Sequence, residues 1–200
     1  MGVVELLRPY LPVSRVVKTK DGTFSLNYDE PKSIGYIAPF YGNFGVIVRA
    51  YAYLLMLGRG GLREASNMAV LNANYVQEKL RPHFDAVAPG RCMHECVFSG
   101  AGFGQYGIHT LDIAKGLIDR GMHPPTIYFP LNVPEAIMIE PTETESRETL
   151  DEFVQHMIAL AELAKKDPDA LHRAPVTTPV GRLDEVAAAR NMNLTYTGPE

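Results

Sequence analysis

Two cysteines and a histidine alternate at positions 92, 94 and 96, and these are the residue types that bind zinc most often. A strand predicted over residues 92–99 would place Cys92, His94 and Cys96 on one face, because side chains alternate with a period of two. A tetrahedral zinc site needs a fourth ligand, and the nearest histidines, His109 and His123, belong to no second clustered pair. The segment therefore favours buried thiols, and we expect no metal site.

His94 and Glu95 are the first pair that could exchange a proton. Adjacent residues on a strand face opposite sides of the sheet, so this pair is predicted not to form a dyad. A buried histidine with a satisfied hydrogen bond is the simpler interpretation of His94. Two other side chains could reach a substrate. His123 precedes two prolines and is extended, and Glu140 follows a strand predicted over residues 136–139.

The spacing Gly102-x-Gly104-x-x-Gly107 follows a predicted strand and precedes a helix predicted over residues 110–120, as in a dinucleotide-binding fingerprint. That fingerprint also needs an acid at the end of the next strand to hold the ribose. The next predicted strand, residues 126–129, is followed by proline and leucine instead. A tight glycine turn is the favoured interpretation, and nucleotide binding stays open as an alternative.

A loop rich in glycine and aromatic residues, 33–45, runs into a strongly apolar segment over residues 46–57. Glycine lets the backbone approach a ligand closely, and free N–H groups at a helix N-terminus suit an anion such as phosphate. The polar groups available are the side chains of Ser33 and Asn43 and the amides of Gly42 and Gly45. Packing against a partner is the alternative, which the composition alone favours because of four aromatic residues: Tyr36, Phe40, Tyr41 and Phe44.

The elements that would position these residues fall into two parts. Residues 1–32 are irregular, apart from a hairpin predicted around Asp21-Gly22. The apolar helix 46–57 is predicted to be buried, or to expose a large patch where its covering domain is absent. A second helix, 62–80, would be about 30 Å long and could bridge two domains. Strands and helices alternate from residue 84, with further helices over 146–165 and 183–190.

The chain has 200 residues, of which 46% are hydrophobic, and a net charge of −4. These values are typical of one globular domain, or of one domain with an appendage. Lysine and arginine are interspersed with acids, so we expect no nucleic-acid binding. No apolar stretch approaches the roughly 20 residues of a membrane span, and sparse cysteine fits the cytoplasm. The residues alone support an α/β domain with a loop that faces a ligand or a partner.

Six motifs follow one another along the chain: PKSIG, FYGNFGVIVRAYAYLLMLG, GLREASNMAVLNANY, CMHE, TLDIAKGLIDRGMHPPTIYFPL and MIEPTETES. In this order they resemble the carboxy-terminal part of the second subunit of glycine decarboxylase, the P-protein of the glycine cleavage system. The resemblance extends from about residue 3 to about residue 164. The glycine-rich stretch 99–107 departs from the family pattern.

The resemblance implies an aminotransferase-like (fold type I) α/β enzyme that depends on pyridoxal phosphate (PLP). It divides this chain into residues 1–60 as the terminal piece of the large PLP domain, residues 61–82 as a bridging helix, and residues 83–200 as the small α/β domain. It also implies that eight residues line the cofactor pocket or the cleft: Ser33, Gly35, Phe40, Gly42, Asn43, His94, His123 and Thr126.

The implied reaction is decarboxylation of glycine, with PLP as electron sink and transfer of the aminomethyl group to the lipoyl group of H-protein. The lysine that holds PLP belongs to a His-Lys-Thr element upstream of this chain. We therefore expect no catalytic residue here and an inactive isolated chain. The implied partners are glycine, H-protein and the first subunit of glycine decarboxylase, in a cytoplasmic hetero-oligomer. A non-catalytic binding or assembly module is the alternative from a different functional class.

Overall fold

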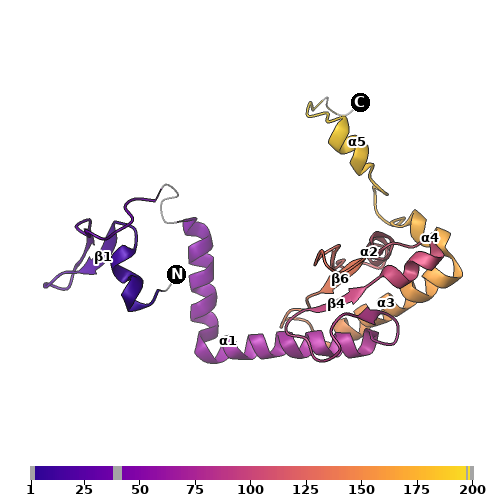
Figure 1. Ribbon diagram of the computed structural model, residues 1–200, viewed down its shortest axis with the longest axis horizontal. Helices are drawn as coiled ribbons and strands as arrows, with labels where there is room; N and C mark the ends of the chain where they lie inside the picture. Colours follow the sequence, from indigo (N-terminus) through magenta and orange to yellow (C-terminus); the bar gives the residue numbers. More distant parts are fainter. Residues whose placement is uncertain (1–2, 38–41, 197, 199–200) are drawn as a thin grey trace. The chain divides into compact units, whose positions relative to one another are not determined.

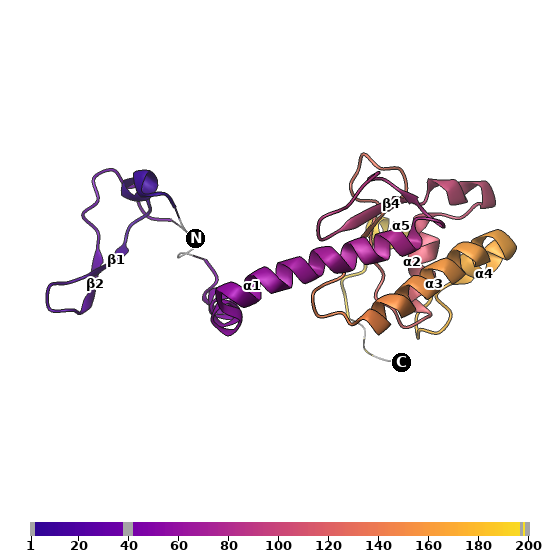
Figure 2. The ribbon, with the colours of Figure 1, turned by 90° about the horizontal axis from the view of Figure 1, so that it is seen from below.

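The computed structural model describes residues 3–37, 42–196 and 198. These residues belong to two compact units, Met1–Arg59 and Gly60–Glu200, and each is described by itself (Figures 1 and 2). One long helix, α1 (Phe44–Leu80), runs across the boundary between them. Within the described ranges, no helix is both long enough and apolar enough to span a bilayer.

The first unit contains a short 3-10 helix, η1 (Glu5–Tyr10), and an antiparallel hairpin of β1 (Arg15–Lys18) and β2 (Phe24–Asn27). The hairpin turn contains Asp21 and Gly22, so the predicted hairpin is confirmed. Gly22 adopts a φ of 89°, which glycine reaches without a steric penalty. Hydrogen bonds from two neighbouring threonines lower the pKa of the Asp21 carboxyl and close the turn.

The α1 helix is broken at Gly58, whose φ of 60° and ψ of −173° are not helical. The sequence predicts two helices, 46–57 and 62–80, with three glycines between them. Only Gly58 leaves the helical conformation, and the next two glycines continue the helix at a cost of about 1 kcal/mol each relative to alanine. Two helical segments therefore exist as predicted, but the second begins directly after Gly58.

The two segments of α1 differ in exposure. From residue 44 to Gly58 every side chain is exposed except a half-buried Leu57. The burial predicted for residues 46–57 is therefore wrong for this chain, and the alternative, an exposed apolar patch, is confirmed. After Gly58 the helix buries five side chains: Asn72, Ala73, Val76, Gln77 and Leu80.

The second unit is built on a four-stranded antiparallel sheet in the order β3-β4-β6-β5. Its strands are β3 (Asp85–Ala86), β4 (Cys96–Ser99), β6 (Ala136–Ile139) and β5 (Thr126–Ile127). The strand predicted over residues 92–99 begins only at Cys96. The reason is that the backbone N–H and C=O of Cys92 bond to the side chain of Asn74 on α1, at 3.0 and 2.8 Å, instead of to a neighbouring strand.

The second unit also contains five helices in its described residues, and those predicted over residues 110–120, 146–165 and 183–190 are all present. They are η2 (Ala101–Tyr106), α2 (Thr110–Ile118), α3 (Arg147–Lys166), α4 (Pro168–Arg173) and α5 (Glu185–Arg190). Ser146 caps α3 by accepting a hydrogen bond from the N–H of Thr149 at 3.2 Å.

One hydrophobic core joins the sheet to the second segment of α1 and to α2, α3 and α4. Phe98 from β4, Leu80 from α1 and Leu160 from α3 are fully buried in it. Gly116 allows α2 to pack closely on the other helices, because a Cβ there would lie 2.5 Å from Leu160 and 3.0 Å from Leu171. The core thus holds β4 and β6 in fixed positions, and the candidate site lies at their ends.

The segment that follows α4 is held by two carboxylates, one from Asp112 in α2 and one from Asp119 at the C-cap of α2. The Asp112 Oδ1 atom accepts a hydrogen bond from the Arg182 guanidinium at 2.6 Å. Asp119 accepts hydrogen bonds from the backbone N–H groups of Val176 at 2.7 Å and Thr177 at 2.8 Å. Burial alone would raise the pKa of Asp119, but these hydrogen bonds outweigh it and lower the pKa.

Candidate functional site

A cleft of about 290 Å³ lies in the second unit between α1, β6, the loop after α2 and the start of α3. Its wall is largely apolar, with Val76, Ile139, Leu150 and Phe153 among the lining residues. Four polar side chains also line it: His123, Glu140, Glu145 and Thr149. An apolar cleft with a few polar groups is the usual form of a small-molecule site.

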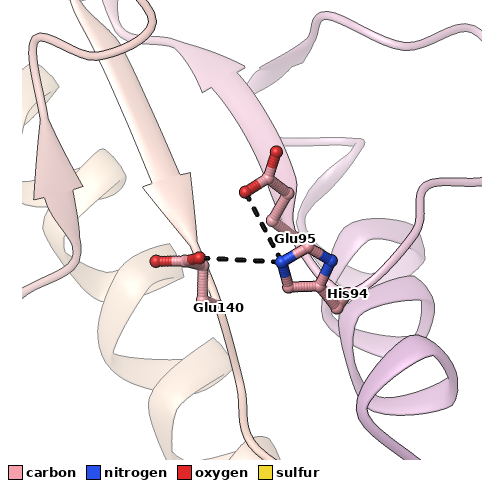
Figure 3. Close-up of side chains that lie close together, drawn as sticks. All are labelled: His94, Glu95 and Glu140. Atoms are coloured by element: carbon pink, nitrogen blue, oxygen red, sulfur yellow. Dashed lines mark ion pairs between the residues drawn. The ribbon is translucent and has the colours of Figure 1, made fainter. Parts of the chain in front are cut away.

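A histidine and two carboxylates meet beside this cleft (Figure 3). The Nε2 atom of His94 lies 4.0 Å from a carboxylate oxygen of Glu95 and 4.0 Å from one of Glu140. Glu140 also lines the cleft, so the cluster and the cleft share one residue. We refer to His94, Glu95 and Glu140 as the carboxylate–histidine cluster.

Two expectations for this segment are wrong. His94 and Glu95 were expected to face opposite sides of a strand, yet their side chains converge because β4 starts only after them. His94 was also expected to be buried, but its side chain is 62% exposed. The convergence is fixed by the pairing of β4 with β6, which sequence spacing does not reveal.

The expectation of buried thiols is confirmed for Cys96 but not for Cys92. Cys96 is buried and Cys92 is half-buried, and both are free. Burial raises the pKa of Cys96 to about 12, and it also raises the pKa of Cys92. Both thiols are therefore protonated at neutral pH.

The predicted pocket residues of the first unit hold their own loop together. The Ser33 hydroxyl donates to the C=O of Leu11 at 2.6 Å and accepts from the N–H of Gly35 at 3.0 Å. Asn43 accepts a hydrogen bond from the N–H of Val46 at 3.2 Å, at the start of α1. Gly35 and Gly42 have φ values of 86° and 101°, and Phe40 lies outside the described residues. Their part in a cofactor pocket stays a prediction.

The predicted residues of the second unit are not all brought together. His123 lines the cleft with Glu140, and Glu140 contacts His94. Thr126 begins β5 at the edge of the sheet, is exposed, and is not among the described lining residues of the cleft. The structure thus links His94 and His123 through Glu140.

Glu135 is a structural residue that the sequence did not suggest. Its φ is 49°, a left-handed value that is uncommon for glutamate. Its carboxylate accepts from the N–H of Thr110 at 2.8 Å and lies 3.2 Å from the Nδ1 atom of His109. Burial opposes ionisation, but these bonds outweigh it and lower the pKa of Glu135. No pattern in the sequence marks a residue whose role depends on a loop bringing it to a helix N-terminus.

The glycine-rich stretch does not form a phosphate-binding turn. Residues 101–106 form the 3-10 helix η2, and two residues separate Gly107 from α2. The N-terminus of α2 already faces two carboxylates, because Asp112 accepts from the N–H of His109 at 2.8 Å and Glu135 accepts from the N–H of Thr110. A phosphate there would meet negative charge, which argues against the nucleotide-binding alternative.

Comparisons with known proteins point to one family. A family model described as the C-terminal domain of glycine dehydrogenase matches residues 65–174. The chain is 54% identical, over 98% of its length, to "Probable glycine dehydrogenase (decarboxylating) subunit 2" of Halalkalibacterium halodurans. It is 53% identical, over its whole length, to the protein of the same name in Bacillus cytotoxicus. In each case the chain spans 40% of the length of the relative.

A solved structure shares the fold. It is the crystal structure of glycine decarboxylase (P-protein) of the glycine cleavage system in an inhibitor-bound form. The TM-score is 0.61 at 18% identity, and the match covers 78% of this chain and 37% of the other. The α/β fold expected from the sequence is therefore the fold of part of that enzyme.

Proposed function

Because the chain belongs to the family of glycine dehydrogenase C-terminal domains, we propose that it forms the carboxy-terminal part of subunit 2 of a decarboxylating glycine dehydrogenase. The complete enzyme would decarboxylate glycine and pass the aminomethyl group to the lipoyl group of H-protein. The observation that carries this proposal is the identity of 52–54% to subunit 2 proteins over essentially all of the chain.

We infer that the lysine that anchors PLP is not one of this chain's lysines. The seven lysines are Lys18, Lys20, Lys32, Lys79, Lys115, Lys165 and Lys166, and none is among the described residues that line the cleft. Lys165 pairs with Glu162 at 2.8 Å, and Lys79 lies 5.5 Å from the ring centre of Tyr75. PLP in the complete enzyme would serve as the electron sink, with its lysine supplied by another part of the protein.

This chain would contribute the cleft. Its apolar wall would exclude water from a bound group, and His123 and Glu140 could orient that group or exchange a proton with it at the imidazole and carboxylate. Residues 1–60 would belong to the large domain, 61–82 would form the bridging helix, and 83–200 would form the small domain. The boundary between the units at Arg59 and the start of the family match at residue 65 support this division.

The exposed apolar segment of α1, residues 44–57, would be covered by another part of the complete enzyme or by subunit 1. The numbering of the relatives as subunit 2 supports a hetero-oligomer. The two free cysteines, one of them buried, fit a reducing compartment, so we place the enzyme in the cytoplasm.

A chimera tests the catalytic proposal. The amino-terminal three-fifths of the Halalkalibacterium halodurans relative is joined to this chain, and glycine-dependent CO2 release is measured with subunit 1 and lipoylated H-protein. The chimera should release CO2 at a rate comparable to the intact relative, which serves as the matched control. A folded chimera that binds subunit 1 but releases no CO2 would contradict the proposal.

The isolated chain tests the claim about the lysine. Mixed with PLP and then treated with borohydride, it should retain no cofactor on a unique lysine, and it should not decarboxylate glycine. Stoichiometric labelling of one lysine would show that the anchor is present after all. Binding to subunit 1 and H-protein without turnover, even in the chimera, would instead support the non-catalytic assembly module.

A further inference from the structure

The carboxylate–histidine cluster brings together side chains from two segments that are far apart in the sequence. His94 and Glu95 precede β4, and Glu140 follows β6 (Figure 3). The Nε2 atom of His94 and one oxygen of each carboxylate all lie within 4.8 Å of one another. The three side chains are partly exposed, so they can rotate and are open to solutes.

The pairing of β4 with β6 explains why the two carboxylates come close together. Cys96 lies opposite Ile139, and Glu95 directly precedes Cys96 while Glu140 directly follows Ile139. Two like charges held this close repel each other. Among the ion pairs of the described residues, neither carboxylate is matched with a lysine or an arginine, and only His94 lies between them. The site therefore has two negative charges next to the paired ends of β4 and β6.

We propose that His94, Glu95 and Glu140 bind a divalent first-row metal ion, with zinc as the best fit. One imidazole nitrogen and two carboxylate oxygens form a donor set that suits zinc better than magnesium or calcium, which prefer oxygen ligands alone. Zinc–ligand bonds of about 2.0–2.2 Å require donor atoms roughly 3.3 Å apart. The present separations, 4.0 Å from the imidazole nitrogen to each carboxylate and at most 4.8 Å between any two donor atoms, can reach that value by rotation of partly exposed side chains.

Three protein ligands leave at least one coordination position open. Because Glu140 also lines the cleft, the metal would lie at the mouth of the cleft, where a bound carboxylate, carbonyl or thiolate could take the open position. Metal binding at this cluster would follow from the positions of its three side chains and can be measured without glycine turnover.

Metal binding is measured on the whole chain by calorimetric titration with Zn²⁺, and by visible absorption with Co²⁺. We expect one ion per chain, with excess Mg²⁺ unable to displace it. His94→Gln and Glu140→Gln should each weaken binding by at least about tenfold, since even the loss of a supporting residue commonly costs about 10–100-fold. His156→Gln is the matched control, because His156 lies 3.7 Å from the single carboxylate of Glu152 on α3, and it should bind as the native chain does.

A stability measurement separates metal binding from a structural role. Without metal, Glu95→Gln and Glu140→Gln should each raise the melting temperature, because each removes the repulsion between the two carboxylates. With Zn²⁺ the native chain should gain melting temperature and these variants should not. Absence of saturable binding, or equal binding by the His94 and Glu140 variants, would overturn the proposal. A lower melting temperature of both metal-free Gln variants would also count against it.

Discussion

The two segments of α1 make an instructive pair, since they are helical, adjacent in sequence and separated only by Gly58. Residues 44–57 carry aromatic and aliphatic side chains that are almost all exposed, including Tyr51, Leu55 and Met56. The second segment is more polar, yet it buries Val76 and Leu80 completely and even the amide of Gln77. Apolar character alone therefore does not determine burial. The second segment packs on the sheet, α2 and α3, whereas the first is left exposed in the part of the chain that the structure describes.

The largest expected effect on the free energy of unfolding comes from replacing one leucine in each segment by alanine. Leu80→Ala removes a fully buried side chain and should lower the free energy of unfolding by about 2–5 kcal/mol, because it leaves a cavity. Leu55→Ala removes a side chain that is 66% exposed and should change the free energy of unfolding by less than about 0.5 kcal/mol. Chemical denaturation of both variants measures the difference. Equal losses would mean that the first segment is packed in solution and that the contrast is wrong.

A glycine pair sharpens the same contrast at a smaller scale. Gly116→Ala would push a methyl group against Leu160 and Leu171 and should destabilise the chain by about 1–3 kcal/mol. Gly60→Ala meets no atom within 4 Å in a helical position and should stabilise by up to about 1 kcal/mol. Thermal unfolding of the two variants should show a lower melting temperature for Gly116→Ala and a higher one for Gly60→Ala. A stabilising Gly116→Ala would show that the helices of the core can separate without penalty.

Self-association tests the exposed segment directly. Met56 is 75% exposed within the apolar face, and Met56→Lys should weaken self-association of the chain by about tenfold, or about 1.4 kcal/mol. Leu131→Lys is the control, because Leu131 is even more exposed, at 89%, but lies outside residues 44–57, and it should leave association unchanged. Sedimentation over a dilution series provides the measurement. A native chain that stays monomeric at every concentration would contradict the prediction.

Features that depend on residues close together in the sequence could be predicted, and features that depend on distant residues could not. The Asp21-Gly22 hairpin and the break at Gly58 each depend on a few neighbouring residues, and each is found in the structure. The cluster of His94, Glu95 and Glu140 could not be predicted, because it depends on the register between two strands about 40 residues apart. It also depends on the bonds between Cys92 and Asn74, which lie 18 residues apart in the sequence.

The smallest expected effect concerns pH and the fastening of the segment after α4. The folded-state pKa of Asp119 lies below its usual value of 3.8, so its contribution to stability is present above pH 3.8 and is lost as the pH falls through the lowered pKa. The amide protons of Val176 and Thr177, which donate to Asp119, should therefore shift in NMR spectra with a common midpoint below pH 3.8. Asp119→Asn, which cannot ionise, should remove that transition while leaving the amides of the hairpin unaffected. A midpoint at or above pH 3.8 would mean that the carboxylate does not hold this segment, and that Arg182 and Asp112 anchor it alone.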